Sequence, residues 1–240
     1  MALLHTPARP CAHTLRVLAH LLRYPDALWC AHGAELSTAL QQEAALSRSR
    51  RAELDALLQR LGPQPTLQAQ AQYVELFDRG RRTALHLFEH VHGDSRERGP
   101  AMVDLVQTYE QAGLLLAPDE LPDHLPVLLE FASTQPPAQA RAFLAEFAHI
   151  VRVIFSALLA HPSAYAQAYA SVLAAVLELA GQRAEAVVVP AEPALDESWA
   201  EPAAFDGCTS AGQTRPAQTT TQVQPIRFVS SPPSSLGVRS

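Results

Sequence analysis

The stretch from His86 to His90 reads HLFEH, with two histidines four residues apart and a glutamate directly before the second. The order H-x-x-E-H occurs in one class of zinc peptidases, where the histidines bind the metal and the glutamate acts as a general base. On a helix, His86, Glu89 and His90 share a polar face, as a zinc site requires. A third protein ligand is also needed. The sequence does not single out one among distant carboxylates such as Glu130 and Glu146.

The sequence contains no second constellation of catalytic residues. It has no GxSxG, P-loop or GxGxxG motif. Its three cysteines, Cys11, Cys30 and Cys208, form no CxxC pair, and their odd number argues against a disulfide framework. Cys11 and Cys30 fall on or near the first predicted helix, which favours a buried apolar role over a nucleophilic one.

Composition favours packed helices and gives no sign of a nucleic-acid or membrane partner. The chain has 240 residues, of which 48% are hydrophobic and only 6% aromatic, and Ala, Leu and Val dominate the apolar set. All 18 basic residues are arginine, none of them in a dense block, and the net charge is -6. We find no signal-peptide core at the N-terminus and no run near the length of a membrane span. We therefore expect a cytoplasmic protein without membrane insertion.

Helical periodicity extends along the chain to about residue 182. The predicted helices cover approximately residues 15–22, 36–40, 54–61, 67–77, 82–92, 99–113, 121–131, 143–158 and 165–179. Asp123 lies near the positive N-terminal end of the helix that begins in LPDHLPVLLEF. No alternating strand pattern appears. The sequence therefore predicts an all-α fold, a single helical bundle domain over residues 1–183.

The composition changes after this domain. Seven prolines fall between Pro190 and Ser240, among many Ser, Thr and Gln residues. Such a segment buries too little apolar surface to offset its ordering entropy, so residues 184–240 are predicted to be a largely disordered tail. Two apolar islands, LDESWAEPAAF and VQPIRFV, are able to dock on the bundle or on a partner, or to serve as plain linker.

Four blocks between residues 73 and 131 carry a family resemblance. The blocks YVELFDRG, LFEHVHGDSRERG, AMVDL and ELPDHLPVLLEF resemble those of the NarJ family, the delta-subunit chaperones of respiratory nitrate reductase. The N-terminal helices and the segments WAEPAAF and QPIRFV are similar more loosely. All but the first residue of HLFEH lies inside one of these blocks, so the resemblance argues that its zinc-peptidase order is a coincidence.

The resemblance implies a non-enzymatic assembly factor without a cofactor of its own. Members bind the apo catalytic alpha subunit of nitrate reductase, within the alpha-beta complex and including its N-terminal segment. They support molybdenum cofactor and iron–sulfur cluster insertion before membrane docking, and they are not part of the final enzyme. Proteins that deliver the molybdenum cofactor are implied as further partners. A chaperone of a dimethyl sulfoxide or trimethylamine oxide reductase, or an HxxEH hydrolase, remains an alternative.

A helix-in-groove binding mode needs apolar walls and a charged rim. The expected walls are Tyr73, Phe77, Phe88 and Leu125, although each also suits a helix core. The expected rim groups are Glu89, His90, Asp104, Asp123 and His124. Because histidines cluster among these residues, we expect binding to depend on pH.

Overall fold

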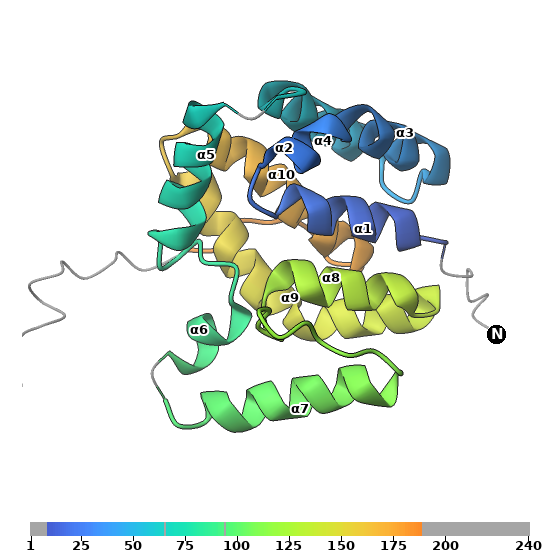
Figure 1. The fold of residues 1–240 in the computed structure, drawn as a ribbon, viewed down its shortest axis with the longest axis vertical. Coiled ribbons are helices and arrows are strands. Elements are labelled where there is room, and N and C mark those ends of the chain that lie inside the picture. Colours follow the sequence, from blue (N-terminus) through green and yellow to red (C-terminus); the bar gives the residue numbers. More distant parts are fainter. Residues whose placement is uncertain (1–8, 65, 94, 189–240) are drawn as a thin grey trace, which may run out of the picture. The chain divides into compact units, whose positions relative to one another are not determined.

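The computed structural model describes residues 9–64, 66–93 and 95–188, and within these ranges it contains helices and no strand. The prediction of an all-α fold is thus confirmed (Figure 1). The helices are Ala12–Leu21 (α1), Ala27–Ala31 (α2), Gly33–Glu43 (α3), Arg48–Leu61 (α4), Leu67–Tyr73 (α5), the π-helical turn Val74–Asp78 (η1), Leu87–His92 (α6), Arg98–Gln111 (α7), Leu125–Thr134 (α8), Pro137–Ala160 (α9) and Ala164–Leu179 (α10).

Local sequence signals set several helix ends. The side chains of Ser47, Thr66 and Ser163 accept hydrogen bonds from backbone N–H groups in the first turns of α4, α5 and α10. At the C-terminal side of α7, Gly113 has φ 79°, a left-handed conformation that glycine adopts without strain. The loop that leaves α7 at this glycine crosses to α8.

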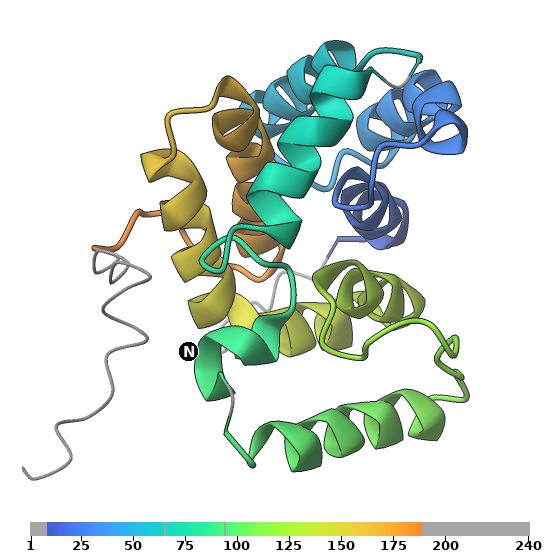
Figure 2. The ribbon, with the colours of Figure 1, turned by 60° about the vertical axis from the view of Figure 1, so that its left-hand side comes forward.

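The core is built on the antiparallel pair α9 and α10. Helix α10 is buried on almost all sides from Ala166 to Leu177, which identifies it as the central helix. Helix α4 packs on α10, and α1 packs on α8 (Figures 1 and 2). The long apolar stripes predicted over residues 143–158 and 165–179 correspond to α9 and α10.

Helix α9 departs from the expectation that no run approaches a membrane span. By length and composition alone, α9 is apolar enough to cross a membrane. However, 44% of its most apolar window is buried in the bundle, and the core helix of a soluble protein passes the same test. Its packing against α10, α8 and α6 accounts for its apolar character.

Helix α6 is shorter than predicted, since it begins at Leu87 and not near residue 82. The preceding residues form an antiparallel β-bridge with the segment before α8. The Leu87 N–H donates to the Asp123 carbonyl at 3.0 Å, and the Leu125 N–H donates to the Leu85 carbonyl at 2.9 Å. His86 therefore lies in extended backbone before the helix, and the expected polar face shared by His86, Glu89 and His90 does not form.

The chain remains in contact with the bundle past the predicted domain end at residue 183. Residues 182–188 run without helix, and the Val187 N–H donates to the Ser156 hydroxyl at 2.9 Å. The rest of the predicted tail, with both apolar islands, lies outside the described residues, so its disorder stays a prediction.

Candidate partner-binding site

Asp123 is the centre of a buried polar cluster between α6, α7 and α8. Its side chain is fully buried, with 0% of its surface exposed. The Phe88 N–H donates to its Oδ2 at 3.1 Å, so the carboxylate caps the first turn of α6. The Arg98 guanidinium, from the first residue of α7, lies 3.8 Å from the same oxygen. Sequence reasoning placed Asp123 at the start of α8, but its side chain stabilises the start of α6.

Two stacked histidines complete the cluster. The rings of His86 and His124 lie 4.9 Å apart at an angle of 27°. His86 Nδ1 is 3.6 Å from Asp123 Oδ1, and this carboxylate raises the pKa of His86 while burial opposes the rise. Burial, assisted by the charge of His86, lowers the pKa of His124 to about 4. The two imidazoles therefore titrate at different pH, and His86 gains its proton first as the pH falls.

Glu89 and His90 have separate partners. Glu89 forms an ion pair with Arg98 at 3.2 Å, and His90 Nε2 lies 2.8 Å from the Ala84 carbonyl oxygen. His86 is directed to Asp123 instead. Among the described residues, no three His, Cys, Asp or Glu side chains form a group that could hold a metal ion.

Three of the four expected groove walls are core residues. Tyr73, Phe77 and Leu125 are 6%, 5% and 1% exposed. The Tyr73 hydroxyl donates to the Leu22 carbonyl at 2.8 Å, and the Phe77 ring packs edge-on against Tyr169 at 5.0 Å. A role for these three side chains in partner binding stays a prediction, and it would require the helices around them to separate.

Phe88 on α6 and Asp104 on α7 are the two remaining members of the predicted set. Phe88 is partly buried, and its ring lies 6.4 Å from that of Phe147 on α9. Asp104 is exposed on α7, where its backbone carbonyl accepts a hydrogen bond from Thr108. Asp104 is thus a surface carboxylate, and within the described part of the chain no hydrogen bond or ion pair joins it to the Asp123 cluster.

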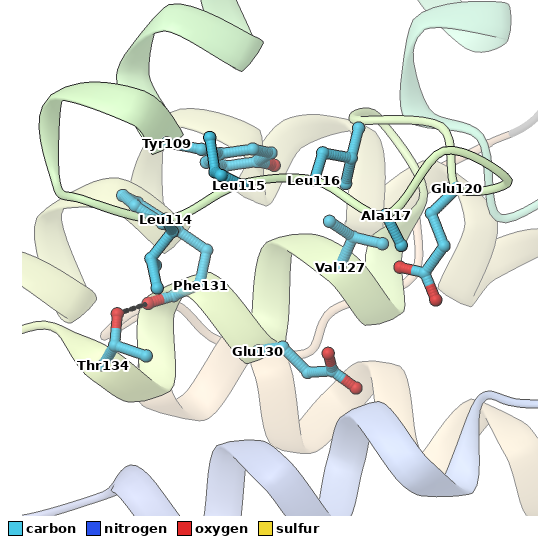
Figure 3. A pocket seen from close by; sticks show the side chains of 10 residues that line it. All are labelled: Tyr109, Leu114, Leu115, Leu116, Ala117, Glu120, Val127, Glu130, Phe131 and Thr134. Atoms are coloured by element: carbon cyan, nitrogen blue, oxygen red, sulfur yellow. Dashed lines mark hydrogen bonds between the residues drawn. The ribbon is translucent and has the colours of Figure 1, made fainter.

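A cleft of about 320 Å³ lies between α8 and the loop that follows α7, and sequence reasoning did not find it. Figure 3 shows the loop crossing above α8, with leucine side chains along its course. The Tyr109 hydroxyl holds the loop by donating to the Pro122 carbonyl at 2.8 Å. The lining residues are Tyr109, Leu114, Leu115, Leu116, Ala117, Glu120, Val127, Glu130, Phe131 and Thr134.

The cleft combines an apolar lining with an acidic edge. Glu120 and Glu130 share one cation, Arg23, at 2.9 and 3.0 Å. Leu115 is 87% exposed, although isolated leucines gain free energy by leaving water. The signal for this cleft was the run Leu114–Leu116 between a glycine and a proline, because three leucines in a loop form an apolar surface without a helix to bury them.

Fold and site together define an all-helical protein with an apolar, acid-edged cleft. The chain belongs to the nitrate reductase delta subunit family, whose model matches residues 43–171. This range contains the Asp123 cluster and the whole cleft. The NarJ resemblance inferred from the sequence is thereby confirmed.

Individual relatives agree with this assignment. Over 152 residues the chain is 45% identical to the nitrate reductase molybdenum cofactor assembly chaperone NarJ of Escherichia coli K12, covering 63% of this chain and 64% of that protein. It is 43% identical over 140 residues to the probable chaperone NarW of the same strain, with 58% of each chain covered. The probable NarJ of Bacillus subtilis is 34% identical over 170 residues, which span 71% of this chain and 91% of the relative.

Proposed function

We propose that the protein is an assembly chaperone of respiratory nitrate reductase and not an enzyme. It binds the apo catalytic alpha subunit, including its N-terminal segment, in the cytoplasm. It supports molybdenum cofactor and iron–sulfur cluster insertion before membrane docking, and it is absent from the final enzyme. Support comes from the family membership and from relatives that are named as molybdenum cofactor assembly chaperones.

The observation that carries the proposal is the cleft between α8 and the loop of residues 112–120. Its leucines and Phe131 match the apolar face of an amphipathic helix. Glu120 and Glu130 exceed the single positive charge of Arg23, which favours a client segment with cationic residues beside its apolar face. Figure 3 places both carboxylates beside the apolar lining, where they fix the direction in which such a helix lies.

Release requires only that the loaded client binds more weakly than the apo client. A protein that binds the unassembled state shifts the assembly equilibrium by mass action. Once cofactor insertion buries the client segment, the loaded client binds more weakly and the complex dissociates. The cycle therefore proceeds without ATP.

Calorimetric titration with a synthetic peptide of the client's N-terminal segment tests the proposal. Leu115→Gln removes an exposed leucine of the cleft, and Leu67→Gln is a matched control because Leu67 is 86% exposed and lies in a different hollow. We expect one-to-one binding that Leu115→Gln weakens by about tenfold, the free energy of one buried apolar side chain, whereas Leu67→Gln changes nothing.

Other outcomes would contradict the proposal in distinct ways. Equal affinities for both variants would place the client outside this cleft. Binding of the corresponding peptide from a dimethyl sulfoxide reductase, but not of the nitrate reductase peptide, would assign another client. Absence of binding to either peptide would overturn the chaperone function as stated.

A further inference from the structure

Helices α6 and α7 form an arm: the start of α6 is paired with the segment before α8, whereas α7 is attached to the bundle at few points. Of the 14 residues of α7, only Leu105 and Tyr109 are buried. Figures 1 and 2 both place α7 at the edge of the bundle, between α6 and the loop that leads to α8. At its C-terminal end, the Tyr109 ring packs on Phe131 at 4.7 Å. At its N-terminal end, Arg98 reaches the Asp123 cluster.

A continuous series of aromatic rings connects this arm to α8 and α9. The successive ring contacts are His92–Phe88 at 5.7 Å, Phe88–Phe147 at 6.4 Å, Phe147–Phe143 at 5.2 Å, Phe143–Phe131 at 4.9 Å and Phe131–Tyr109 at 4.7 Å. Phe88, Phe143 and Phe147 are only partly buried. Because Tyr109 and Phe131 also line the cleft, this aromatic series continues the cleft toward α6.

The Asp123 carboxylate is only partly satisfied. Its Oδ2 accepts one hydrogen bond, from the Phe88 N–H, while Arg98 remains at 3.8 Å. Its Oδ1 is buried, as is His86 Nδ1, and neither atom has a hydrogen-bond partner among the described residues. These two atoms face each other at 3.6 Å, slightly beyond hydrogen-bonding distance. A buried carboxylate oxygen in this state costs free energy until a donor reaches it.

We propose that Asp123, His86 and Arg98 form a latch that positions α6 and α7 over the aromatic series, and that release of this latch opens the series to apolar client residues. The proposal rests on the proposed function for the identity of the client. Asp123 is a positioning residue in this account, because it acts through the arm and does not contact the client.

The charges around His86 give the latch its direction of response to pH. Four titratable or charged groups face His86. Asp123 and His124 belong to the segment before α8, Glu89 belongs to α6, and Arg98 belongs to α7. The Asp123 carboxylate raises the pKa of His86, so this imidazole gains its proton more readily in the closed arrangement. Protonation turns the Nδ1–Oδ1 contact into a charge-assisted hydrogen bond, which closes the latch. Loss of the proton at higher pH opens it.

Hydrogen exchange of the full chain at pH 6 and pH 8, corrected for intrinsic rates, measures the latch directly. The variants are His86→Gln and, as a matched control, Asp104→Asn, which alters an exposed carboxylate of the same arm. We expect amides of residues 87–111 to be about threefold more protected at pH 6 than at pH 8. His86→Gln should abolish this difference, and Asp104→Asn should keep it. A pH difference that survives in His86→Gln, or that disappears in Asp104→Asn, would overturn the latch.

The same proteins are then titrated with the synthetic client peptide at both pH values. We expect wild type and Asp104→Asn to bind about threefold more tightly at pH 8, and His86→Gln to bind equally at both. If His86→Gln removes the pH dependence of hydrogen exchange but no protein binds the peptide, the proposed function is overturned and the latch is retained. If the peptide binds in the cleft but His86→Gln changes neither hydrogen exchange nor peptide affinity, the proposed function is retained and the latch is overturned.

Discussion

At the scale of single residues, the two stacked histidines make stability depend on pH in opposite directions. The folded-state pKa of His124 is lowered to about 4 by burial, so the unfolded chain binds the extra proton between pH 6.5 and pH 4. Stability therefore falls as the pH decreases through this range. The pKa of His86 is raised by Asp123, so its contribution is complete below pH 6.5 and is lost as the pH rises through the folded-state pKa.

Denaturant unfolding at pH 5, 6.5 and 8 should separate these two effects. We expect wild type to lose about 1–2 kcal/mol between pH 6.5 and pH 5 through His124, and His124→Gln to lose correspondingly less. His86→Gln should instead reduce the loss between pH 6.5 and pH 8. Variants whose pH profiles parallel that of wild type would show that neither imidazole has the environment described.

At the scale of elements, the π-helical turn Val74–Asp78 depends on a close approach at Gly80. The Arg79 N–H donates to the Val74 carbonyl at 3.0 Å, the spacing of five residues that defines a π turn. The Thr83 hydroxyl donates to the Leu76 carbonyl, which this turn leaves available. A Cβ atom at Gly80 would collide with both the Leu76 carbonyl oxygen and the Thr83 hydroxyl.

Gly80→Ala should therefore destabilise the protein by about 2 kcal/mol, because the backbone oxygen of Leu76 cannot move aside cheaply. Gly99→Ala is the matched control, since a Cβ there meets nothing within 4 Å and alanine favours the first turn of α7. The free energy of unfolding from urea titration checks both variants. Equal stability of the two would mean that the turn at Gly80 adjusts without cost.

The helices that sequence analysis predicted well are those whose pattern is local. Helices α9 and α10 have long apolar stripes, and Pro162 and Gly181 limit them. The start of α6 was wrong because a distant segment determines it: residues 123–125 pair with residues 85–87 and hold them extended. The spacing of apolar residues along the sequence gives no information about this contact between distant segments.

At the scale of the whole molecule, the site was only partly predictable for the same reason. The position of Asp123 at a helix start singled it out as a rim group, but its contacts with Phe88 and Arg98 arise from the packing of three helices. Tyr73, Phe77 and Leu125 were expected as groove walls, yet hydrophobic spacing alone does not distinguish a groove from a core. The cleft itself needs the loop after Gly113 to cross α8, which depends on the tertiary contact between Tyr109 and Pro122.

The absence of lysine from the whole sequence gives a sharp test of where a client lies. Carbodiimide joins carboxylates to amines, so a client peptide with one lysine beside its apolar face couples without competition from lysines of this chain. We expect amide bonds to Glu120 or Glu130, where the peptide cation displaces Arg23. Glu53 and Glu178 are internal controls, because they also lie on either side of one arginine, Arg50, on α4 and α10, although Glu178 accepts hydrogen bonds from Ser47 as well.

Peptide mass spectrometry identifies the carboxylate that is coupled to the peptide. Coupling at the Glu120/Glu130 pair and coupling at the Glu53/Glu178 pair lead to different conclusions about where the client binds. Coupling at Glu120 or Glu130, lost in Leu115→Gln, would show that the apolar cleft and its acidic edge bind one segment together. Coupling at Glu53 would move the client to the hollow of about 410 Å³ between α4, α9 and α10, which Glu53 lines. Each acidic pair holds two carboxylates around one arginine, so the loss of coupling at Glu120 or Glu130 in Leu115→Gln measures what the apolar surface contributes beyond the attraction of cations.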